Sequence, residues 1–156
     1  MRKGFIVGAV VLVAVLALLY FAAIKPALDT PKDPLQINLR DHNNLAMHIH
    51  PFLEIIINGK SFPIPANIGI TDAGMRVIHT HDSTGKLHVE SPYPTSLYLS
   101  DFFKIWGKRF DDQCIFDNCK DDTHDLKMYV NGEPSDLYGA LLLRDGDRIK
   151  IVYGAP

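Results

Sequence analysis

The chain has 156 residues, 47% of them hydrophobic, and 16 Lys and Arg residues against 18 Asp and Glu residues give a formal net charge of −2. This length suits one globular domain beside a shorter segment, and the mixed, non-repetitive composition excludes coiled-coil, collagen-like and low-complexity chains. A mildly acidic domain binds the phosphate backbone poorly, so we expect no nucleic-acid partner.

The first predicted element is a transmembrane helix within the apolar run 5–24, which contains no charged residue. Twenty helical residues extend about 30 Å, the hydrocarbon thickness of a bilayer. Arg2 and Lys3 precede the run, so the positive-inside bias places the N-terminus in the cytoplasm and the rest of the chain outside. We expect residues 1–24 to be a single-pass anchor in the cell membrane. The alternative is a cleaved signal peptide, which also exports the domain.

A stalk is expected next, because residues 25–44 hold Pro26, Pro31 and Pro34 among mixed charges with little periodicity. The expected organisation is therefore an anchor over 1–24, a proline-rich stalk over 25–44 and an extracytoplasmic β domain over 45–156.

The domain itself carries β-type signals. Four dipeptides have the glycine, Asn or Asp that tolerates the positive φ of tight hairpin turns. They are Asn58-Gly59, Thr84-Gly85, Asn131-Gly132 and Asp145-Gly146. The segments beside them are rich in β-forming residues and predict strands over 48–57, 61–64, 76–81, 86–90, 126–130 and 148–153.

One short helix is predicted where Leu99, Phe102, Phe103 and Trp106 share one face, and this aromatic stripe is expected to pack in the core. Ser100 can cap its start and Gly107 can stop it. A second helical turn is expected from residue 135 into 137–143. The predicted fold is thus mainly β, of the α+β class, with a small antiparallel sheet or roll and one or two short helices after the transmembrane helix.

The closing stretch, LKMYVNGEPSDLYGALLLRDGDRIKIVYG, reads as strand, Asn-Gly turn, helical turn, Asp-Gly-Asp turn and final strand. In this order it resembles the end of β-grasp domains, which implies a β-grasp-like topology. Ubiquitin-like sulfur carriers end in a Gly-Gly tail, whereas this chain ends in Gly154-Ala155-Pro156. The resemblance therefore concerns the topology and not that activity.

Six of the seven histidines lie between positions 42 and 88, and four of them form two His-x-His pairs, His48–His50 and His79–His81. In a strand, residues i and i+2 project from the same face, so each pair would present two imidazoles together. Glu54 lies an even number of positions after His48 and His50, so in one continuous strand it would project from the same face. Pro51 can introduce a bulge that changes this alternation.

The second pair lies in a predicted hairpin with the sequence HTHDSTGKLHVE. If residues 82–85 form a four-residue loop, His81 opposes Lys86 and His79 opposes His88. Glu90 then shares the face of His88, and opposed residues have Cβ atoms roughly 4.5–5.5 Å apart. The imidazoles can therefore converge on one ion.

Several imidazoles with a carboxylate form a nitrogen and oxygen donor set that suits Zn²⁺, Cu²⁺, Ni²⁺ or Fe²⁺ better than Ca²⁺ or Mg²⁺. The sequence predicts a copper or zinc site, and its candidate ligands are His48, His50, His79, His81, His88 and Glu90. The alternative is a hydrogen-bonded histidine network or a protonation switch. His42 and His124 are expected to lie outside the site, in the stalk and a loop.

His48, His50 and Glu54 also have the spacing of the first cupin motif, so this part resembles cupins. The glycines of that motif are replaced by His42 and Ser61, and the second cupin motif is missing. The resemblance implies a metal-dependent enzyme as an alternative to a binding domain.

Cys114 and Cys119 are the two cysteines of the chain. Outside the cytoplasm we expect them to form a disulfide with a local effect on stability. A metal-ligating or redox-active pair is the alternative. The acidic residues around them disfavour a reactive thiolate, and we expect this acidic cluster to be a solvated loop, with weak Ca²⁺ binding as a minor option.

Five strings carry a further resemblance: HIHPFLEIIINGKSFPIPANIGI, VIHTHDSTGKLHVESP, LYLSDFFKIWGKRF, CIFDNCKDD and MYVNG. Together they cover roughly residues 45–153 and resemble a family of exported, single-span, His-rich proteins of archaea, chiefly ammonia oxidisers. The resemblance implies an extracytoplasmic location and shared histidines, and it implies no particular activity.

The favoured function is a membrane-anchored extracytoplasmic metal-binding domain that handles or senses copper or zinc, or serves as an accessory to a membrane complex. A cupin-like metal-dependent enzyme is one alternative, and a cell-surface interaction or assembly domain with structural histidines is the other. The sequence contains no Walker loop and no GxGxxG, HExxH or GxSxG motif, so catalysis is not the favoured interpretation.

Overall fold

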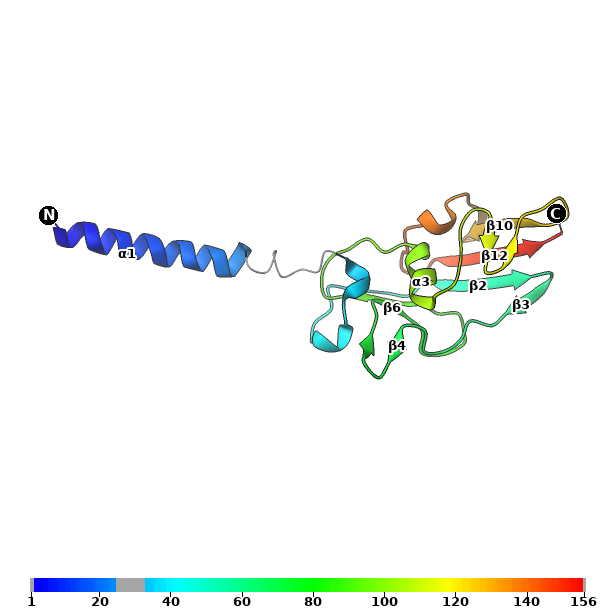
Figure 1. Cartoon of the computed structure of the whole chain (residues 1–156), viewed down its shortest axis with the longest axis horizontal. Coiled ribbons are helices and arrows are strands. Elements are labelled where there is room, and N and C mark those ends of the chain that lie inside the picture. Colours follow the sequence, from blue (N-terminus) through cyan, green and yellow to red (C-terminus); the bar gives the residue numbers. More distant parts are fainter. Residues whose placement is uncertain (1, 25–32, 156) are drawn as a thin grey trace. The chain divides into compact units, whose positions relative to one another are not determined.

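The structure is a computed structural model that describes residues 2–24 and 33–155 (Figure 1). The chain divides into two units, residues 1–32 and residues 33–156. The first unit contains α1 (Arg2–Leu19), followed by the π-helical turn η1 (Tyr20–Ile24). No helix among the described residues has both the length and the apolar character needed to cross a bilayer. The transmembrane anchor therefore stays a prediction, and residues 25–32 of the predicted stalk lie outside the described part.

The second unit begins with two short 3-10 helices, η2 (Pro34–Gln36) and η3 (Leu39–Asp41). Asp33 caps the first of them, since its side chain accepts a hydrogen bond from the N–H of Leu35. Ile37 and Leu39 are 3% and 4% exposed and belong to the hydrophobic core. Residues 33–41 were expected to be part of the stalk, but the burial of these two apolar side chains makes them part of the compact unit.

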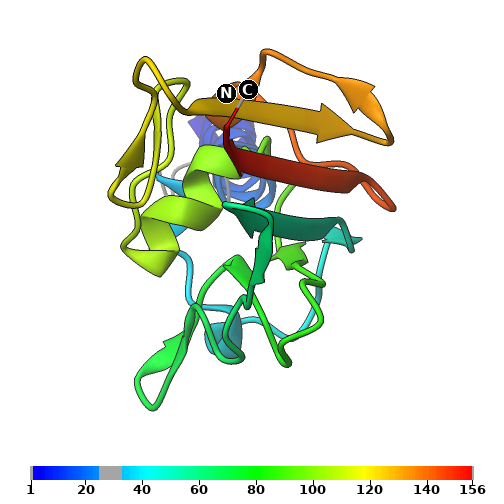
Figure 2. The same cartoon turned by 90° about the vertical axis from the view of Figure 1, so that its right-hand side faces the viewer.

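A five-stranded sheet forms one part of this unit, with the order β11-β10-β12-β2-β3. The strands are β2 (Phe52–Ile57), β3 (Lys60–Phe62), β10 (Asp125–Val130), β11 (Glu133–Pro134) and β12 (Arg148–Gly154). Figure 2 shows β10, β12 and β2 side by side. The prediction of a mainly β, α+β domain is confirmed. The central pair β12 and β2 is parallel, however, with Ile151 opposite Ile55, so the sheet is mixed rather than antiparallel throughout.

Two of the four predicted turns close tight hairpins in this sheet. Asn58-Gly59 joins β2 to β3, and Asn131-Gly132 joins β10 to β11. All four residues have positive φ, between 51° and 91°, as a type I′ turn requires. At Thr84-Gly85 and Asp145-Gly146 the glycines also have positive φ, but the chain there turns without closing a two-residue hairpin.

The predicted helix is α3 (Leu99–Trp106), and its Phe102 and Phe103 are fully buried in the core. Gly107 ends it in the left-handed conformation, as predicted. The predicted cap at Ser100 is wrong, because the N-cap is Tyr98, whose N–H donates to the Asp101 carboxylate at 2.9 Å. The second predicted helical turn is the 3-10 helix η4 (Tyr138–Ala140).

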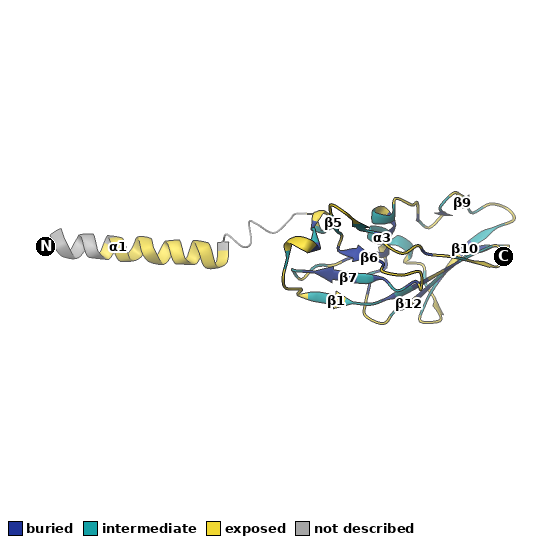
Figure 3. Cartoon of the chain, turned by 90° about the horizontal axis from the view of Figure 1, so that it is seen from below, coloured by how far each residue is buried: buried dark blue, intermediate teal, exposed yellow. Residues whose placement is uncertain are grey.

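A second, three-stranded antiparallel sheet has the order β1-β7-β6. Its strands are β1 (Met47–Ile49), β6 (Ile78–His79) and β7 (His88–Ser91), and the small hairpin of β4 (Ile70–Thr71) and β5 (Gly74–Met75) precedes β6. The predicted single strand 48–57 is thus divided at residues 50–51, since β1 and β2 belong to different sheets. Figure 3 shows that β6 and β7 are buried, whereas β1 lies partly at the surface.

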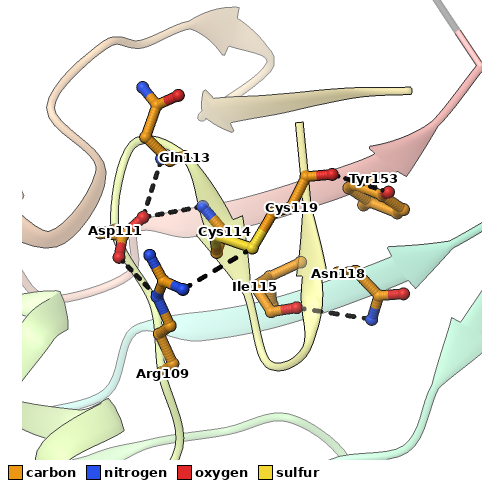
Figure 4. Close-up of a disulfide and its surroundings, with 8 residues drawn as sticks. All are labelled: Arg109, Asp111, Gln113, Cys114, Ile115, Asn118, Cys119 and Tyr153. Carbon is orange, nitrogen blue, oxygen red and sulfur yellow. Dashed lines mark hydrogen bonds and ion pairs between the residues drawn. A yellow bond between two sulfur atoms is a disulfide. The ribbon is translucent and has the colours of Figure 1, made fainter. Parts of the chain in front are cut away.

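The two cysteines form the expected disulfide (Figure 4). They oppose each other in a small hairpin of β8 (Cys114–Ile115) and β9 (Asn118–Cys119). Tyr153 connects this hairpin to β12, because its hydroxyl donates to the carbonyl of Cys119 at 2.9 Å. The disulfide rules out both cysteines as thiolate ligands of a metal in this structure.

Candidate metal centre

The middle strand of the three-stranded sheet, β7, sets the register of the site. Its His88 lies opposite His79 of β6, and its Glu90 lies opposite His48 of β1. Residues 88 and 90 share one face of the strand because side chains alternate. The predicted pairing of His79 with His88 is confirmed. Lys86 forms its bridge with Phe52 instead of with His81, because the pairing of β6 ends at His79.

The structure brings together the rings of five histidines, which we call the histidine cluster: His48, His50, His79, His81 and His88. Their ring nitrogens form two groups that could hold a metal ion, each with one atom per residue and with all three atoms within 4.8 Å of one another. The outer triad consists of His48, His50 and His88. The inner triad consists of His79, His81 and His88, so the two triads share His88.

In the outer triad, Nε2 of His50 lies 3.2 Å from Nδ1 of His88, and the rings of His48 and His50 have centroids 4.6 Å apart. His50 follows the end of β1, and its position comes from a distant segment. Its backbone N–H donates to the carboxylate of Asp145 at 2.8 Å. Sequence reasoning identified Asp145-Gly146 as a turn but gave no sign that this turn would hold a histidine of the site.

In the inner triad, Nε2 of His79 lies 3.2 Å from Nε2 of His81. The opposite nitrogen of His79, Nδ1, lies 3.0 Å from the carbonyl oxygen of Arg76. A carbonyl only accepts hydrogen bonds, so Nδ1 carries the proton of the neutral ring and the lone pair of Nε2 faces His81. Metal-ligating histidines are commonly oriented by a hydrogen bond of this kind from the other ring nitrogen.

Thr80, between the two histidines of the inner pair, holds this segment in place. Thr80 is fully buried. Its hydroxyl donates a hydrogen bond to the carbonyl of Pro65 at 2.8 Å and accepts one from the N–H of Ile68 at 3.0 Å. Gly69 lets its segment pass close to the backbone of β6, because a Cβ there would lie 2.5 Å from the carbonyl oxygen of Ile78. We did not predict either residue as part of the site, although Thr80 stands inside the His-Thr-His string.

Burial differs across the cluster and changes the protonation of the rings. His79 is fully buried, whereas the side chains of His88 and His48 are 19% and 50% exposed. Burial lowers the pKa of His79 from 6.5 to about 4, although the Arg76 carbonyl opposes the shift. Burial, followed by the neighbouring His81 and His50, also lowers the pKa of His88. Both rings are therefore neutral near pH 7, the form in which imidazole binds metals.

Glu90 lies beside the cluster, as predicted. It is 8% exposed, and its Oε1 lies 3.1 Å from Nε2 of His48 and 3.6 Å from Nδ1 of His88. Neither triad includes it, since both consist of histidines alone. A carboxylate in this position can complete the coordination of the outer triad or accept hydrogen bonds from its rings.

Glu54 does not join the histidines, so the cupin-like spacing does not produce a cupin-like site. It lies on β2 in the five-stranded sheet, is exposed, and its carboxylate is 3.4 Å from Nζ of Lys150. The chain passes from one sheet to the other between His50 and Phe52, so Glu54 no longer shares a strand face with His48 and His50.

His42 and His124 lie outside both triads, as predicted. The ring of His42 packs against Tyr93, with centroids 5.8 Å apart. His124 stacks on Tyr153, with its Nδ1 3.1 Å from the carboxylate of Asp121. Hydrogen bonds from Thr123 and then from His124 lower the pKa of Asp121 to about 2.

The contact distances in the cluster match those of a metal coordination shell. A tetrahedral Zn²⁺ site with Zn–N bonds of about 2.0–2.1 Å separates adjacent nitrogens by about 3.3–3.4 Å. The nitrogen contacts of 3.2 Å in each triad are close to this value. An open cleft of about 860 Å³ lies elsewhere, on the five-stranded sheet, and the residues that line it include Glu54, Tyr129 and Lys150.

Comparison of the chain with protein-family models, with curated proteins and with solved structures found no match.

Proposed function

We propose that this protein is a membrane-anchored, extracytoplasmic domain that binds copper or zinc through its histidine cluster. The observation that carries the proposal is the convergence of five imidazoles from three chain segments on two sets of ring nitrogens. Ring nitrogens that face one another at 3.2 Å are close enough to bind one cation together.

The donor set supports copper or zinc over other ions. Imidazole suits both metals, and Ca²⁺ and Mg²⁺ prefer shells of oxygen atoms. Raw affinity favours Cu²⁺ among the divalent first-row metals. Because both cysteines are in the disulfide, the ligands come from the imidazoles and from Glu90.

Two features support the location outside the cytoplasm. Disulfides persist mainly in oxidising compartments, and this chain has one. The large apolar side chains of α1 that the structure describes, from Val10 to Leu19, are exposed, with Val13 at 66% and Leu18 at 70%, and lipid would cover such side chains. Arg2 and Lys3 at the start of the same helix support an N-terminus in the cytoplasm by the positive-inside rule.

The five-stranded sheet supports the β-grasp-like topology that the C-terminal sequence implies. The final strand β12 lies between β2 and β10, and the residues of α3 complete the core. In the three-stranded sheet that carries the histidines, β6 and β7 belong to the segment of the chain between β3 and α3. The scaffold thus carries the site: its turn at Asp145 holds the backbone of His50, and both triads consist of histidines outside the five-stranded sheet.

We favour metal handling or sensing over catalysis. The cleft on the five-stranded sheet is lined by residues of β2, β10 and β12 together with Gly132 and Thr84, and none of its lining residues belongs to the histidine cluster. An enzyme of the cupin type needs an apolar cavity beside the metal for its substrate. A purely structural role for the histidines is the competing function, and it predicts that metal leaves the stability unchanged.

The decisive experiment is metal analysis of the full-length protein purified in detergent micelles. We expect bound copper or zinc by elemental analysis, and a rise in melting temperature when the metal is added to metal-free protein. His81→Ala tests the site without risk to the core, because this side chain is exposed, and we expect it to reduce bound metal. His124→Ala is the matched control. Protein without metal whose melting temperature ignores Cu²⁺ and Zn²⁺ would overturn the proposal.

A further inference from the structure

The two triads meet at one residue, and we infer that the histidine cluster binds two metal ions per chain, with the ring of His88 between them. This inference rests on the proposed function and adds the number of ions and the role of His88. It depends on how the ring nitrogens are grouped and on the surroundings of His88.

The grouping separates the two sites. Five nitrogens bound to one ion at about 2.0–2.1 Å would all lie within about 4.2 Å of one another. The structure instead gathers them into two groups of three within 4.8 Å, and His88 is the member common to both. One ion in the outer triad and one in the inner triad use all five imidazoles, whereas a single ion leaves two of them unused.

Histidines of both triads lie close to the ring of His88. Its Nδ1 lies 3.2 Å from His50 and 3.6 Å from Glu90, on the side of the outer triad. The rings of His81 and His79 lie with their centroids 4.5 Å and 5.4 Å from that of His88. The two nitrogens of an imidazole direct their lone pairs apart, so one ring can serve two ions.

The proton balance of this arrangement is simple. In the neutral ring, one nitrogen of His88 has a lone pair and binds the first ion. The other nitrogen carries a proton, and the second ion replaces this proton, which passes to solvent. His88 would then bridge the ions as an imidazolate, and its negative charge and that of Glu90 would offset part of the charge of the two ions.

Each triad has its own means of holding the ligands. His79 of the inner triad is fully buried and oriented by the Arg76 carbonyl. The outer triad is more exposed, and Glu90 and Asp145 contact its members. A variant that removes an exposed, unshared histidine should therefore empty one site and leave the other.

The test is a titration of metal-free full-length protein with Cu²⁺, followed by elemental analysis after removal of free metal. We expect two ions per chain in the original protein. His48→Ala and His81→Ala should each retain one ion, because each removes an exposed ligand of a different triad. His124→Ala should retain two. His88→Ala should bind less than either single-site variant, since it removes the shared ligand.

Electron paramagnetic resonance provides an independent readout. Two Cu²⁺ ions joined by one imidazolate couple magnetically, so the signal of the second equivalent should be weaker than that of the first. One ion per chain, lost in both His48→Ala and His81→Ala, would overturn the two-ion inference and leave metal binding intact. No bound ion at all would instead overturn the proposed function.

Discussion

The two sheets of the domain differ in what their interiors contain. In the five-stranded sheet, β2, β10 and β12 alternate buried apolar residues with more exposed ones, and Ile55, Leu126 and Ile151 are at most 1% exposed. In the three-stranded sheet the strands have two to four residues, and beside the apolar Ile78 and Val89 the buried positions include the polar His79, Glu90 and Ser91. The comparison shows that the first sheet buries apolar side chains in the core, whereas the second buries apolar side chains on one face and histidines with a carboxylate on the other.

The smaller sheet depends on the larger one for its position. The N–H of Leu53 on β2 donates to the carbonyl of Gly85 at 2.8 Å, and the N–H of Leu87 donates to the carbonyl of Pro51 at 2.9 Å. Together with the bond from His50 to Asp145, these contacts place the loop before β7 and the end of β1 against the scaffold. These contacts hold the short three-stranded sheet in the position in which its imidazoles lie together.

The largest effect on stability is expected from a substitution in the apolar core of the scaffold. Phe102→Ala removes a fully buried ring of α3, and we expect the free energy of unfolding to fall by about 3–5 kcal/mol. Urea unfolding monitored by circular dichroism measures this loss. Lys104→Ala, an exposed position on the same helix, should change the stability by less than about 0.5 kcal/mol. Equal effects of the two variants would show that α3 is not part of the core.

The next effect concerns the polar interior of the smaller sheet in metal-free protein. The pKa of His79 is about 4 in the folded chain against an ordinary value of 6.5, so the unfolded chain binds more protons between these values. The free energy of unfolding should therefore be highest above pH 6.5 and fall by about 3 kcal/mol as the pH drops to 4.

Urea unfolding at pH 7, 5.5 and 4 in the presence of a chelator measures this fall. His79→Gln, which does not titrate, should lose less stability over this range than the original chain does. An unchanged pH dependence in this variant would show that His79 is not the buried group responsible.

A smaller effect tests the junction between the sheets. In Gly85→Ala the new Cβ meets the carbonyl oxygen of Leu53, and the residue has a φ of 83°, so we expect a loss of about 1–3 kcal/mol. Gly59→Ala is the matched control, since Gly59 has a φ of 75° and open space around it. Thermal unfolding of the two variants separates the clash from the backbone strain that both share. Gly85→Ala no less stable than Gly59→Ala would contradict the close contact of loop and scaffold.

The smallest effect is expected at Glu54, which has the spacing of a ligand but lies in the scaffold. Glu54→Gln removes an exposed ion pair with Lys150, so the stability should change by less than about 1 kcal/mol. Bound metal, measured by elemental analysis, should be unchanged. Glu90→Gln changes the carboxylate that contacts His48 and should weaken metal binding. If Glu54→Gln weakened metal binding and Glu90→Gln did not, β1 and β2 would not separate into different sheets after His50.

Local sequence signals determined much of the fold. The two Asn-Gly hairpins, the helix ending at Gly107, the disulfide and the opposition of His79 to His88 depend on neighbouring residues or on short loops. The histidines of the site were identified from the two His-x-His pairs and, for His88, from the predicted hairpin, although His50 and His81 lie just beyond the ends of β1 and β6.

Tertiary structure decided which segments these local units meet. The passage from β1 to β2, the parallel pairing of β2 with β12, the burial of Ile37 and Leu39 and the contact of Asp145 with His50 all join residues far apart in the chain or in different sheets. An alternating pattern shows that one face of a strand is buried, but it does not show against which partner. The partner depends on how all the apolar faces of the chain are buried together, and for this reason the sharing of His88 between two triads emerged only from the folded structure.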